Sequence, residues 1–279
     1  MEFLQPPGWR EALHLRAEHP DALPIWGGTD VMVEMNFART RPEALLDLTR
    51  VSELSRWHTE DSWVRIGAGV SYTRVIAELA SELPGLAMAS RTVGSPQIRN
   101  RGTVAGNVGS SSPAGDALPP LYASGAVVEV ESVRGSRALA IDEFIVGPKR
   151  NVLAEDELIA AVRVPVARGP QQFAKVGTRN AMVIAVCSFA LELREDGVGT
   201  CIGSAGPTPL RAREAEAYAS TALDPDAWDD AVARRFGELV AAAASPIDDV
   251  RGSAAYRRHA LSVLAARTLK WAWEERACA

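Results

Sequence analysis

The sequence predicts an α+β protein with a mixed N-terminal part and a C-terminal part in which strands precede helices. Through most of the chain, short apolar runs typical of strands alternate with segments of helical spacing. The run Ala167-Arg168-Gly169-Pro170 then has the composition of a linker. Beyond it, strand-like segments are followed by long alanine-rich segments. A chain of 279 residues suffices for one large domain or for two or three small ones that share a core.

In the N-terminal part, helices and strands are expected to be short. Val75, Ile76, Leu79 and Leu83 share one face at helical spacing, and Asp30 is suited to capping a helix or lying in its first turn. Helices are expected at residues 9–18, 30–37 and 71–83, and strands at 43–48, 64–68, 127–133 and 157–164.

The C-terminal part begins with strand patterns and ends with helical ones. Glu195-Asp196-Gly197 has the composition of a hairpin turn. Gly197, Gly199 and Gly203 faintly resemble a dinucleotide fingerprint, but strand follows them, so we interpret them as part of that hairpin. Strands are expected at residues 173–176, 183–193 and 200–205, and helices at 209–222, 225–244 and 253–276.

Composition and charge exclude several classes of function. Hydrophobic residues make up 47% of the chain and the formal net charge is -5, which indicates a soluble globular protein that binds neither nucleic acid nor an anionic membrane. Neither a signal peptide nor a membrane-spanning run is recognised. The three cysteines, Cys187, Cys201 and Cys278, are far apart, which favours a reducing cytoplasm. An iron–sulphur cluster usually needs four thiolates, so any such cluster must belong to another chain.

The first candidate site is Gly27-Gly28-Thr29-Asp30. Two glycines allow positive φ angles and close approach of a ligand, and the helix start that follows presents free N–H groups. Such a turn suits a pyrophosphate. A plain strand-to-helix turn capped by Asp30 explains the same four residues, and from these residues alone it is favoured by roughly two to one.

The second candidate site lies in residues 93–120, which are rich in Gly, Ser, Asn and Pro. This length is expected to lack regular structure, and a long irregular segment in a compact domain often carries function. Residues 102–107 keep the backbone bare, while residues 110–116 add hydroxyl groups that can donate to phosphate or ribose oxygens. Asp116 can accept from a sugar hydroxyl or a flavin N–H. A solvated surface loop would not need so many small residues.

Lys175 is the third candidate, at the end of an expected strand and shortly before Arg179. A cation at this place would stabilise the anionic form of a reduced flavin. An exposed lysine in a surface ion pair is the more common case. The four histidines are scattered and no paired cysteine motif occurs, so neither a metal site nor a catalytic acid, base or nucleophile is expected.

At this point the residues resemble a known family, the FAD-binding medium subunits of the xanthine dehydrogenase and carbon monoxide dehydrogenase group of molybdenum hydroxylases. The segment from Val93 to Pro119 carries the strongest match, and residues 24–31 and 173–179 look like the family's first flavin loop and its lysine segment. Residues 207–212 and 245–253 look like its C-terminal signatures. The resemblance therefore covers nearly the whole chain in the expected order.

The resemblance implies an FAD-binding fold of the PCMH type, with two α/β subdomains at residues 1–58 and 59–168 and a C-terminal domain of antiparallel sheet and helices at 169–279. FAD would lie between the subdomains, with residues 25–32 on one side of the pyrophosphate and residues 103–107 on the other. An apolar residue and a cation would flank the isoalloxazine. The implied contacts are Ile25, Trp26, Gly27, Gly28, Thr29, Asp30, Val31, Met32, Thr103, Val104, Ala105, Gly106, Asn107, Asp116, Ile159 and Lys175.

The resemblance also implies partners. A small subunit would carry two [2Fe-2S] clusters and a large subunit the molybdenum cofactor, and this cytoplasmic chain would pass electrons through FAD to an external acceptor. A stand-alone FAD oxidase or monooxygenase on the same fold is the alternative. A scaffold that has lost its cofactor is a third, since Ala105 replaces a usual glycine and Trp26 a usual small residue.

Overall fold

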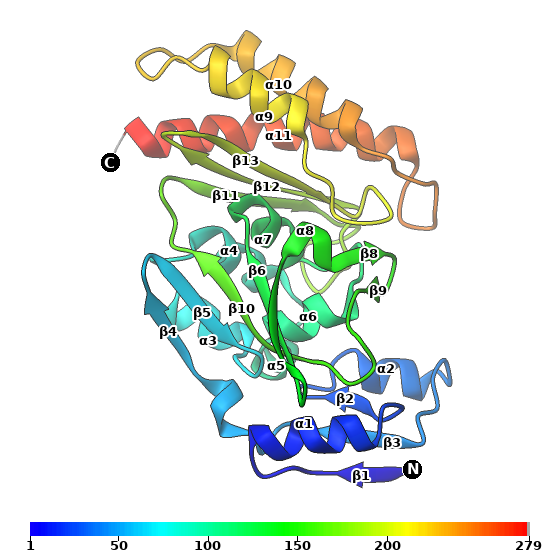
Figure 1. Ribbon diagram of the computed structural model, residues 1–279. Helices are drawn as coiled ribbons and strands as arrows, with labels where there is room; N and C mark the ends of the chain where they lie inside the picture. Colours follow the sequence, from blue (N-terminus) through cyan, green and yellow to red (C-terminus); the bar gives the residue numbers. More distant parts are fainter. Residues whose placement is uncertain (278–279) are drawn as a thin grey trace.

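The computed structural model describes residues 1–277. Its three larger β-sheets are stacked from the N-terminal end towards the last helices (Figure 1). The first sheet has three parallel strands in the order β1-β3-β2. Parallel neighbours need a crossover between them, and two helices provide it. The elements of this unit are β1 Glu2–Leu4, α1 Trp9–Glu18, β2 Leu23–Ile25, α2 Val31–Asn36 and β3 Ala44–Asp47.

The central sheet has five antiparallel strands in the order β4-β5-β10-β6-β7. Val128 and Val130 on β6 are buried while their neighbours are partly exposed, the alternation of a half-covered strand. The strands are β4 Trp57–Glu60, β5 Trp63–Gly67, β6 Val127–Ser132, β7 Gly135–Ala140 and β10 Leu158–Pro165.

Short helices cover the inner face of the central sheet and share its core, together with a small two-stranded hairpin. They are η1 Ser52–Ser55, α3 Tyr72–Glu78, α4 Pro84–Thr92, α5 Pro96–Arg101, α6 Val104–Ser110, α7 Leu118–Ser124 and α8 Ile141–Phe144, with the hairpin β8 Ile145–Gly147 and β9 Arg150–Asn151.

The third sheet is an antiparallel meander, β11-β12-β13, with helices on both faces (Figure 1). The last three helices cover one face, where Phe189 of β12 meets Phe236 of α10 edge to face at 6.2 Å between ring centroids. Helix α7 covers the opposite face. The elements are β11 Gln171–Val176, β12 Cys187–Arg194, β13 Gly197–Gly203, α9 Arg213–Ala222, α10 Asp230–Ala243 and α11 Ala254–Ala277.

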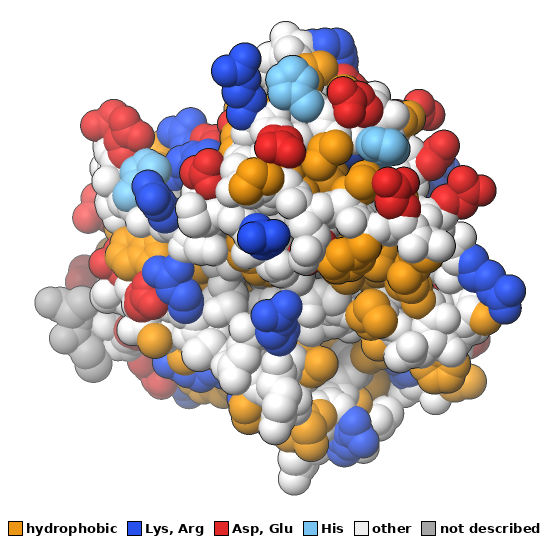
Figure 2. All heavy atoms as spheres, turned by 90° about the horizontal axis from the view of Figure 1, so that it is seen from below, with side chains coloured by type: hydrophobic (Ala, Val, Ile, Leu, Met, Phe, Trp, Pro, Cys, Tyr) orange, Lys and Arg blue, Asp and Glu red, His pale blue; other side chains and the backbone are white. Residues whose placement is uncertain are grey.

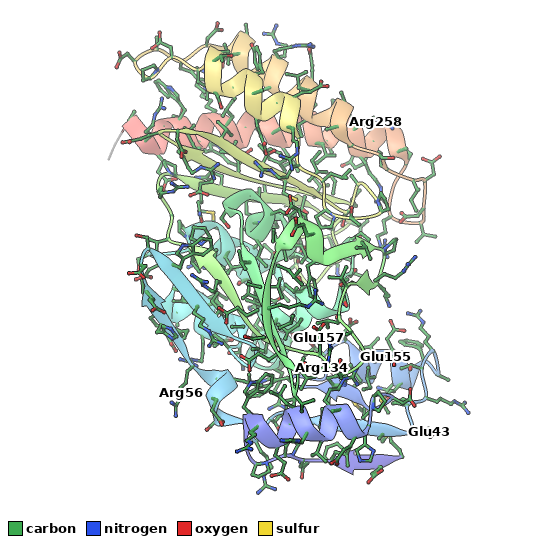
Figure 3. The ribbon with its side chains drawn as sticks, viewed as in Figure 1. Glu43, Arg56, Arg134, Glu155, Glu157 and Arg258 are labelled. Atoms are coloured by element: carbon green, nitrogen blue, oxygen red, sulfur yellow. The ribbon has the colours of Figure 1, made fainter. Side chains whose placement is uncertain are left out.

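The first unit is tied to the central sheet beside α1. The indole N–H of Trp9 on α1 donates to Glu131 of β6 over 2.6 Å. Next to this contact, Arg134 at the β6–β7 turn pairs with Asp156, and Arg137 pairs with Glu157. Figure 3 labels Arg134 and Glu157, one from each pair, near α1. On the face formed by this N-terminal unit, acidic and basic side chains are interleaved with apolar ones (Figure 2).

The predicted α+β class is confirmed, and so is the order of strands and helices beyond residue 170. The prediction that residues 93–120 lack regular structure is wrong, because two short helices and the start of a third occupy them. The helix expected at 71–83 ends at Glu78, and Leu83 precedes a separate helix. Strands β1, β2, β4, β7, β8 and β9 were not predicted. Each has at most six residues, too few for a clear alternation.

The expected domain boundaries remain predictions. The one between residues 58 and 59 falls inside β4, and the one near residue 168 falls in the link between Pro165 and Gln171. Cys278 lies outside the described residues. None of the helices within residues 1–277 is both long and apolar enough to cross a bilayer.

Glycines on β13 allow α7 to lie directly against the third sheet. A Cβ at Gly199 would stand 2.1 Å from the carbonyl oxygen of Ala123 at the end of α7. A Cβ at Gly203 would stand 2.8 Å from the ring of Pro119 at its start. Backbone cannot yield as a flexible side chain can, so Gly199 above all fixes how closely the central and C-terminal units pack.

We expect Gly199→Ala to lower the free energy of unfolding by about 2–3 kcal/mol, because the added methyl overlaps a backbone carbonyl. Urea denaturation measures this change. Gly147→Ala is the matched control, since the nearest atom to its Cβ would be at 3.8 Å. Equal stability of the two variants would show that α7 and β13 are not in close contact.

Candidate functional site

The first glycine loop joins the carboxyl end of β2 to the start of α2. Gly28 has a φ of +71°, a conformation that L side chains rarely adopt. Gly27 faces the second loop, and a Cβ on it would lie 2.1 Å from the carbonyl oxygen of Arg101. The carboxyl ends of parallel strands are where open α/β sheets bind ligands. Gly27 and Gly28 follow the carboxyl end of β2 and therefore lie at a position of this kind.

The second loop turns from α5 into α6. The Thr103 hydroxyl caps α6 by accepting from the backbone N–H of Gly106 over 2.9 Å. Val104 and Ala105 are buried in the central core, so only their backbone can face a ligand. The methyl of Ala105, which departs from the family pattern, is thus packed among core side chains.

The two loops meet at the junction of the first unit and the central helices. Besides the approach of Gly27 to Arg101, a Cβ on Gly102 would lie 3.3 Å from the Thr29 hydroxyl. Asp30 stands at the N-cap position of α2, as expected, but its side chain makes no capping hydrogen bond within residues 1–277. It accepts from the Ser110 hydroxyl instead and so links the first loop to the end of α6.

Asp116 and Lys175 form a buried ion pair next to this junction. The Lys175 ammonium donates to Asp116 Oδ2 over 2.6 Å and to the carbonyl oxygens of Thr92 and Val183. The two side chains are only 9% and 10% exposed. Lys175 is therefore not the exposed lysine of a surface ion pair. Burial raises the pKa of the Asp116 carboxyl, and Lys175 opposes that rise. Lys175 lies on β11, so the C-terminal sheet contributes to the site.

Several polar atoms around the pair lack hydrogen-bond partners within the described residues. They are Asp116 Oδ1, Asn107 Oδ1 and the hydroxyl of Tyr72, all buried. Buried polar groups are nearly always satisfied by protein, water or ligand, so three orphans in one region indicate a place for a polar ligand. Sequence reasoning missed Tyr72, because a tyrosine at the start of an amphipathic helix is indistinguishable from a core aromatic.

The apolar residues of the predicted site differ in what they pack against and in how far they are buried. The indole of Trp26 lies against Gly69, where a Cβ would be 2.3 Å away, so this ring packs on the central unit. Ile159 on β10 reaches Gly109 of α6. Ile25 and Val31 are half-buried, and Met32 is 43% exposed.

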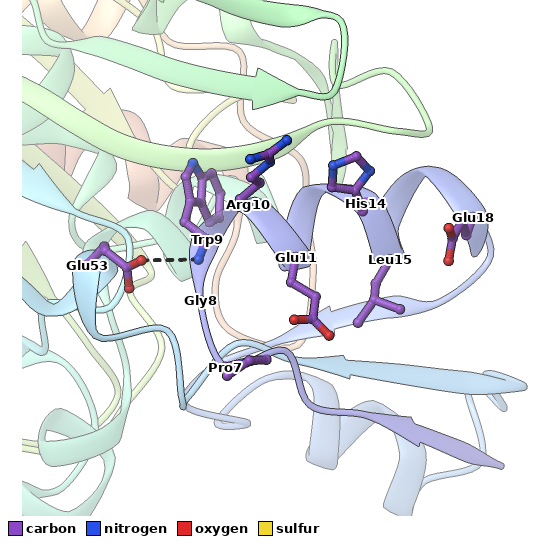
Figure 4. A pocket seen from close by; sticks show the side chains of 9 residues that line it. All are labelled: Pro7, Gly8, Trp9, Arg10, Glu11, His14, Leu15, Glu18 and Glu53. Carbon is purple, nitrogen blue, oxygen red and sulfur yellow. Dashed lines mark hydrogen bonds between the residues drawn. The ribbon is translucent and has the colours of Figure 1, made fainter.

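One hollow on the surface lies away from these residues. It has a volume of about 670 Å³ along the outer side of α1, and none of the predicted contacts lines it (Figure 4). Its lining is Pro7, Gly8, Trp9, Arg10, Glu11, His14, Leu15, Glu18 and Glu53. Across residues 1–277, no cluster of His, Cys, Asp and Glu side chains is suited to a metal ion.

Known proteins share both halves of this architecture. Residues 1–167 match the family described as "FAD binding domain in molybdopterin dehydrogenase", and residues 172–272 match "CO dehydrogenase flavoprotein C-terminal domain". The chain is 33% identical to the nicotinate dehydrogenase FAD-subunit of Eubacterium barkeri over 77% of this chain and 78% of that one. It is 31% identical to the nicotine 6-hydroxylase medium subunit of Paenarthrobacter nicotinovorans over 96% of both.

The fold comparison agrees. A carbon monoxide dehydrogenase from Hydrogenophaga pseudoflava that lacks the Mo-pyranopterin moiety of its cofactor superposes with a TM-score of 0.90 at 28% identity, over 99% of this chain and 98% of that one. These findings define a flavoprotein with an FAD-binding domain and a CO dehydrogenase-type C-terminal domain. The chain belongs to the family of FAD-binding medium subunits of molybdenum hydroxylases, and it is an oxidoreductase subunit with FAD as its cofactor.

The residues present fit FAD. The missing Cβ at Gly27 lets the two loops meet, and the exposed backbone of Gly106 leaves room for a pyrophosphate beside them. The buried oxygens of Asn107 and Asp116, which have no partner within residues 1–277, can accept from cofactor groups. The two departures from the family do not close the site, since Ala105 is packed in the core and Trp26 lies on Gly69.

We expect Gly27→Ala to weaken FAD binding at least ~10-fold, about 1.4 kcal/mol, because the methyl forces the first loop away from the Arg101 carbonyl. Fluorescence titration of the flavin-free chain measures this affinity. Gly147→Ala, in a hairpin with space for a methyl, should bind FAD as the native chain does. Native affinity in the Gly27 variant would mean that contact between the loops is not needed.

The Asp116–Lys175 pair predicts a pH dependence. Because the folded-state pKa of Asp116 is raised, the folded chain holds this proton more tightly, and stability falls as pH rises from the unfolded pKa through the folded one. Lys175→Met removes the opposing cation and raises that pKa further. We expect a loss of about 3–5 kcal/mol near neutral pH that shrinks towards about pH 4, as measured by urea denaturation.

A second variant tests the cause of this pH dependence. Lys175→Met combined with Asp116→Asn carries no buried charge at this place, so its pH profile should be flat compared with that of the single variant. An equally steep profile in both variants would assign the effect to another group.

Proposed function

We propose that this chain holds FAD between its two glycine loops and passes electrons from the iron–sulphur clusters of a partner subunit to an external acceptor. The observation that carries the proposal is the contact between the two glycine loops. The Asp116–Lys175 ion pair lies next to it, with buried oxygens that have no partner within residues 1–277. Such a site binds and tunes a cofactor. Flavin itself accepts electrons singly and releases them singly or in pairs.

The roles of the site residues follow from their positions. Residues 25–32 and 103–107 would enclose the pyrophosphate from two sides, each through a helix start and small residues. Ile159 would provide an apolar surface for the isoalloxazine. The Lys175 ammonium, held by three oxygens, would supply a fixed positive charge that favours the anionic reduced flavin.

The relatives support a hetero-oligomer. Two are named as an FAD-subunit and a medium subunit, and one solved neighbour is a carbon monoxide dehydrogenase that lacks the Mo-pyranopterin moiety of its molybdenum cofactor. We propose a small iron–sulphur subunit and a large molybdenum subunit as the partners of this chain. The proposed compartment is the cytoplasm, where the buried thiols of Cys187 and Cys201 stay reduced.

The deciding experiment co-expresses this chain with the neighbouring genes and purifies the assembly. We expect one FAD for each copy of this chain, and we expect rapid mixing with the substrate of the large subunit to reduce the iron–sulphur clusters and the flavin together. Removing this chain should leave cluster reduction intact and abolish electron delivery to the external acceptor.

A different outcome would favour the alternative function. If the isolated chain binds FAD and its flavin is reduced directly by an organic substrate, without any partner, it is a stand-alone oxidase or monooxygenase. A chain that takes up no FAD, alone or in the assembly, would exclude both functions.

A further inference from the structure

Tyr72 is a buried polar residue that the proposed FAD contacts leave out. Its side chain lies in the central core with 3% of the residue exposed, and its hydroxyl has no hydrogen-bond partner among residues 1–277. Leaving a buried hydroxyl unsatisfied is unfavourable. Phenylalanine would fill the same space without that cost, so the hydroxyl calls for a function.

The fold holds Tyr72 against the second glycine loop. Its backbone N–H donates to the carbonyl oxygen of Gly102 over 3.0 Å, and the preceding residue, Ser71, bridges Thr103. The ring edge lies 3.4 Å from the position of a Cβ on Gly102. Main-chain bonds and ring packing together fix where the hydroxyl is placed, as a binding residue requires.

The segment that carries Asp116 packs on the helix that follows the same loop, because a Cβ on Gly115 would lie 2.6 Å from Asn107 Oδ1 of α6. Burial and the Asp116 charge both raise the pKa of Tyr72, so the phenol stays protonated and can donate. Asp116 Oδ2 is occupied by Lys175, while Asp116 Oδ1 is unpartnered. The two side chains are not hydrogen-bonded to each other. The Tyr72 hydroxyl is therefore a donor, and Asp116 Oδ1 an acceptor, without a partner within residues 1–277. A ligand group that both accepts and donates would satisfy the two.

We propose that Tyr72 is a further FAD-binding residue, whose hydroxyl acts with Asp116 Oδ1 on a cofactor group that both accepts and donates a hydrogen bond. This inference rests on the proposed FAD site. FAD offers the required chemistry at the uracil-like edge of its ring, where an N–H lies between carbonyls, and at the hydroxyls of its ribityl chain. The Asp116–Lys175 pair and Tyr72 would then hold the same part of the cofactor.

The test is Tyr72→Phe in the full chain, stripped of flavin and titrated with FAD. We expect the dissociation constant to rise roughly 3–15-fold, the effect of one lost hydrogen bond. The thermal midpoint of the flavin-free chain should be unchanged or higher, because the variant removes an unsatisfied group. Tyr122→Phe is the matched control, a 3%-exposed tyrosine on α7 outside both loops, and should bind FAD normally.

Two further measurements locate the contact. Asp116→Asn combined with Tyr72→Phe should weaken binding by less than the product of the single effects, because both side chains act on one group. Lumiflavin has the ring without the ribityl chain, and riboflavin has both. A Tyr72→Phe penalty with both ligands assigns the ring edge, and a penalty with riboflavin alone assigns the ribityl hydroxyls.

The outcomes separate this inference from the proposed function. If the native chain binds no FAD, the proposed function fails. If the native chain binds FAD and Tyr72→Phe binds it equally well, only the role of Tyr72 fails, and its hydroxyl interacts with a buried water instead. If Tyr72→Phe weakens FAD binding and also lowers the thermal midpoint of the flavin-free chain, the inference is overturned as well. The hydroxyl of Tyr72 would then stabilise the fold instead of contacting FAD.

Discussion

The contact between the backbone of Gly27 and the carbonyl of Arg101 is the constraint on which the site depends. A side chain at residue 27 would separate the first sheet from the central helices, since backbone stands 2.1 Å from where its Cβ would be. Because the loops touch, Thr29 comes close to Gly102 and Asp30 reaches Ser110. Two helix starts are thereby brought to one place, although they belong to different sheets and lie some seventy residues apart in the chain.

The C-terminal sheet contributes a charged residue to the site that the loops form. Lys175 extends from β11 to Asp116, so one ion pair joins the third unit to the segment between α6 and α7. The backbone N–H of Ser204, after β13, also donates to the carbonyl oxygen of Pro113 in the same segment. A buried pair of this kind adds little stability by itself, but it makes the position of each partner depend on the other. The electrostatics of the site are therefore set by contact between units.

Local sequence predicted much of the fold and part of the site. Trp9–Glu18 was predicted to the residue because its apolar positions follow helical spacing, and the β12–β13 hairpin because its turn is Glu-Asp-Gly. Short helices in residues 93–120 escaped prediction because glycine and serine mask helical periodicity. The glycine loops were recognised from composition, but their mutual contact, the ion pair and the orphan hydroxyl of Tyr72 arise from tertiary packing, which no local pattern records. Only the resemblance to a family predicted that the two loops lie on either side of one pyrophosphate.

The strand order of the central sheet has a consequence for synthesis of the chain. Hairpins β4–β5 and β6–β7 are each local, yet they do not pair with one another, because β10 lies between them. Until residues 158–165 leave the ribosome, β5 and β6 each keep an unpaired edge. Open edges are where nascent chains associate wrongly. Insertion of β10 therefore closes the sheet in a single step, which follows the release of residues 158–165 from the ribosome.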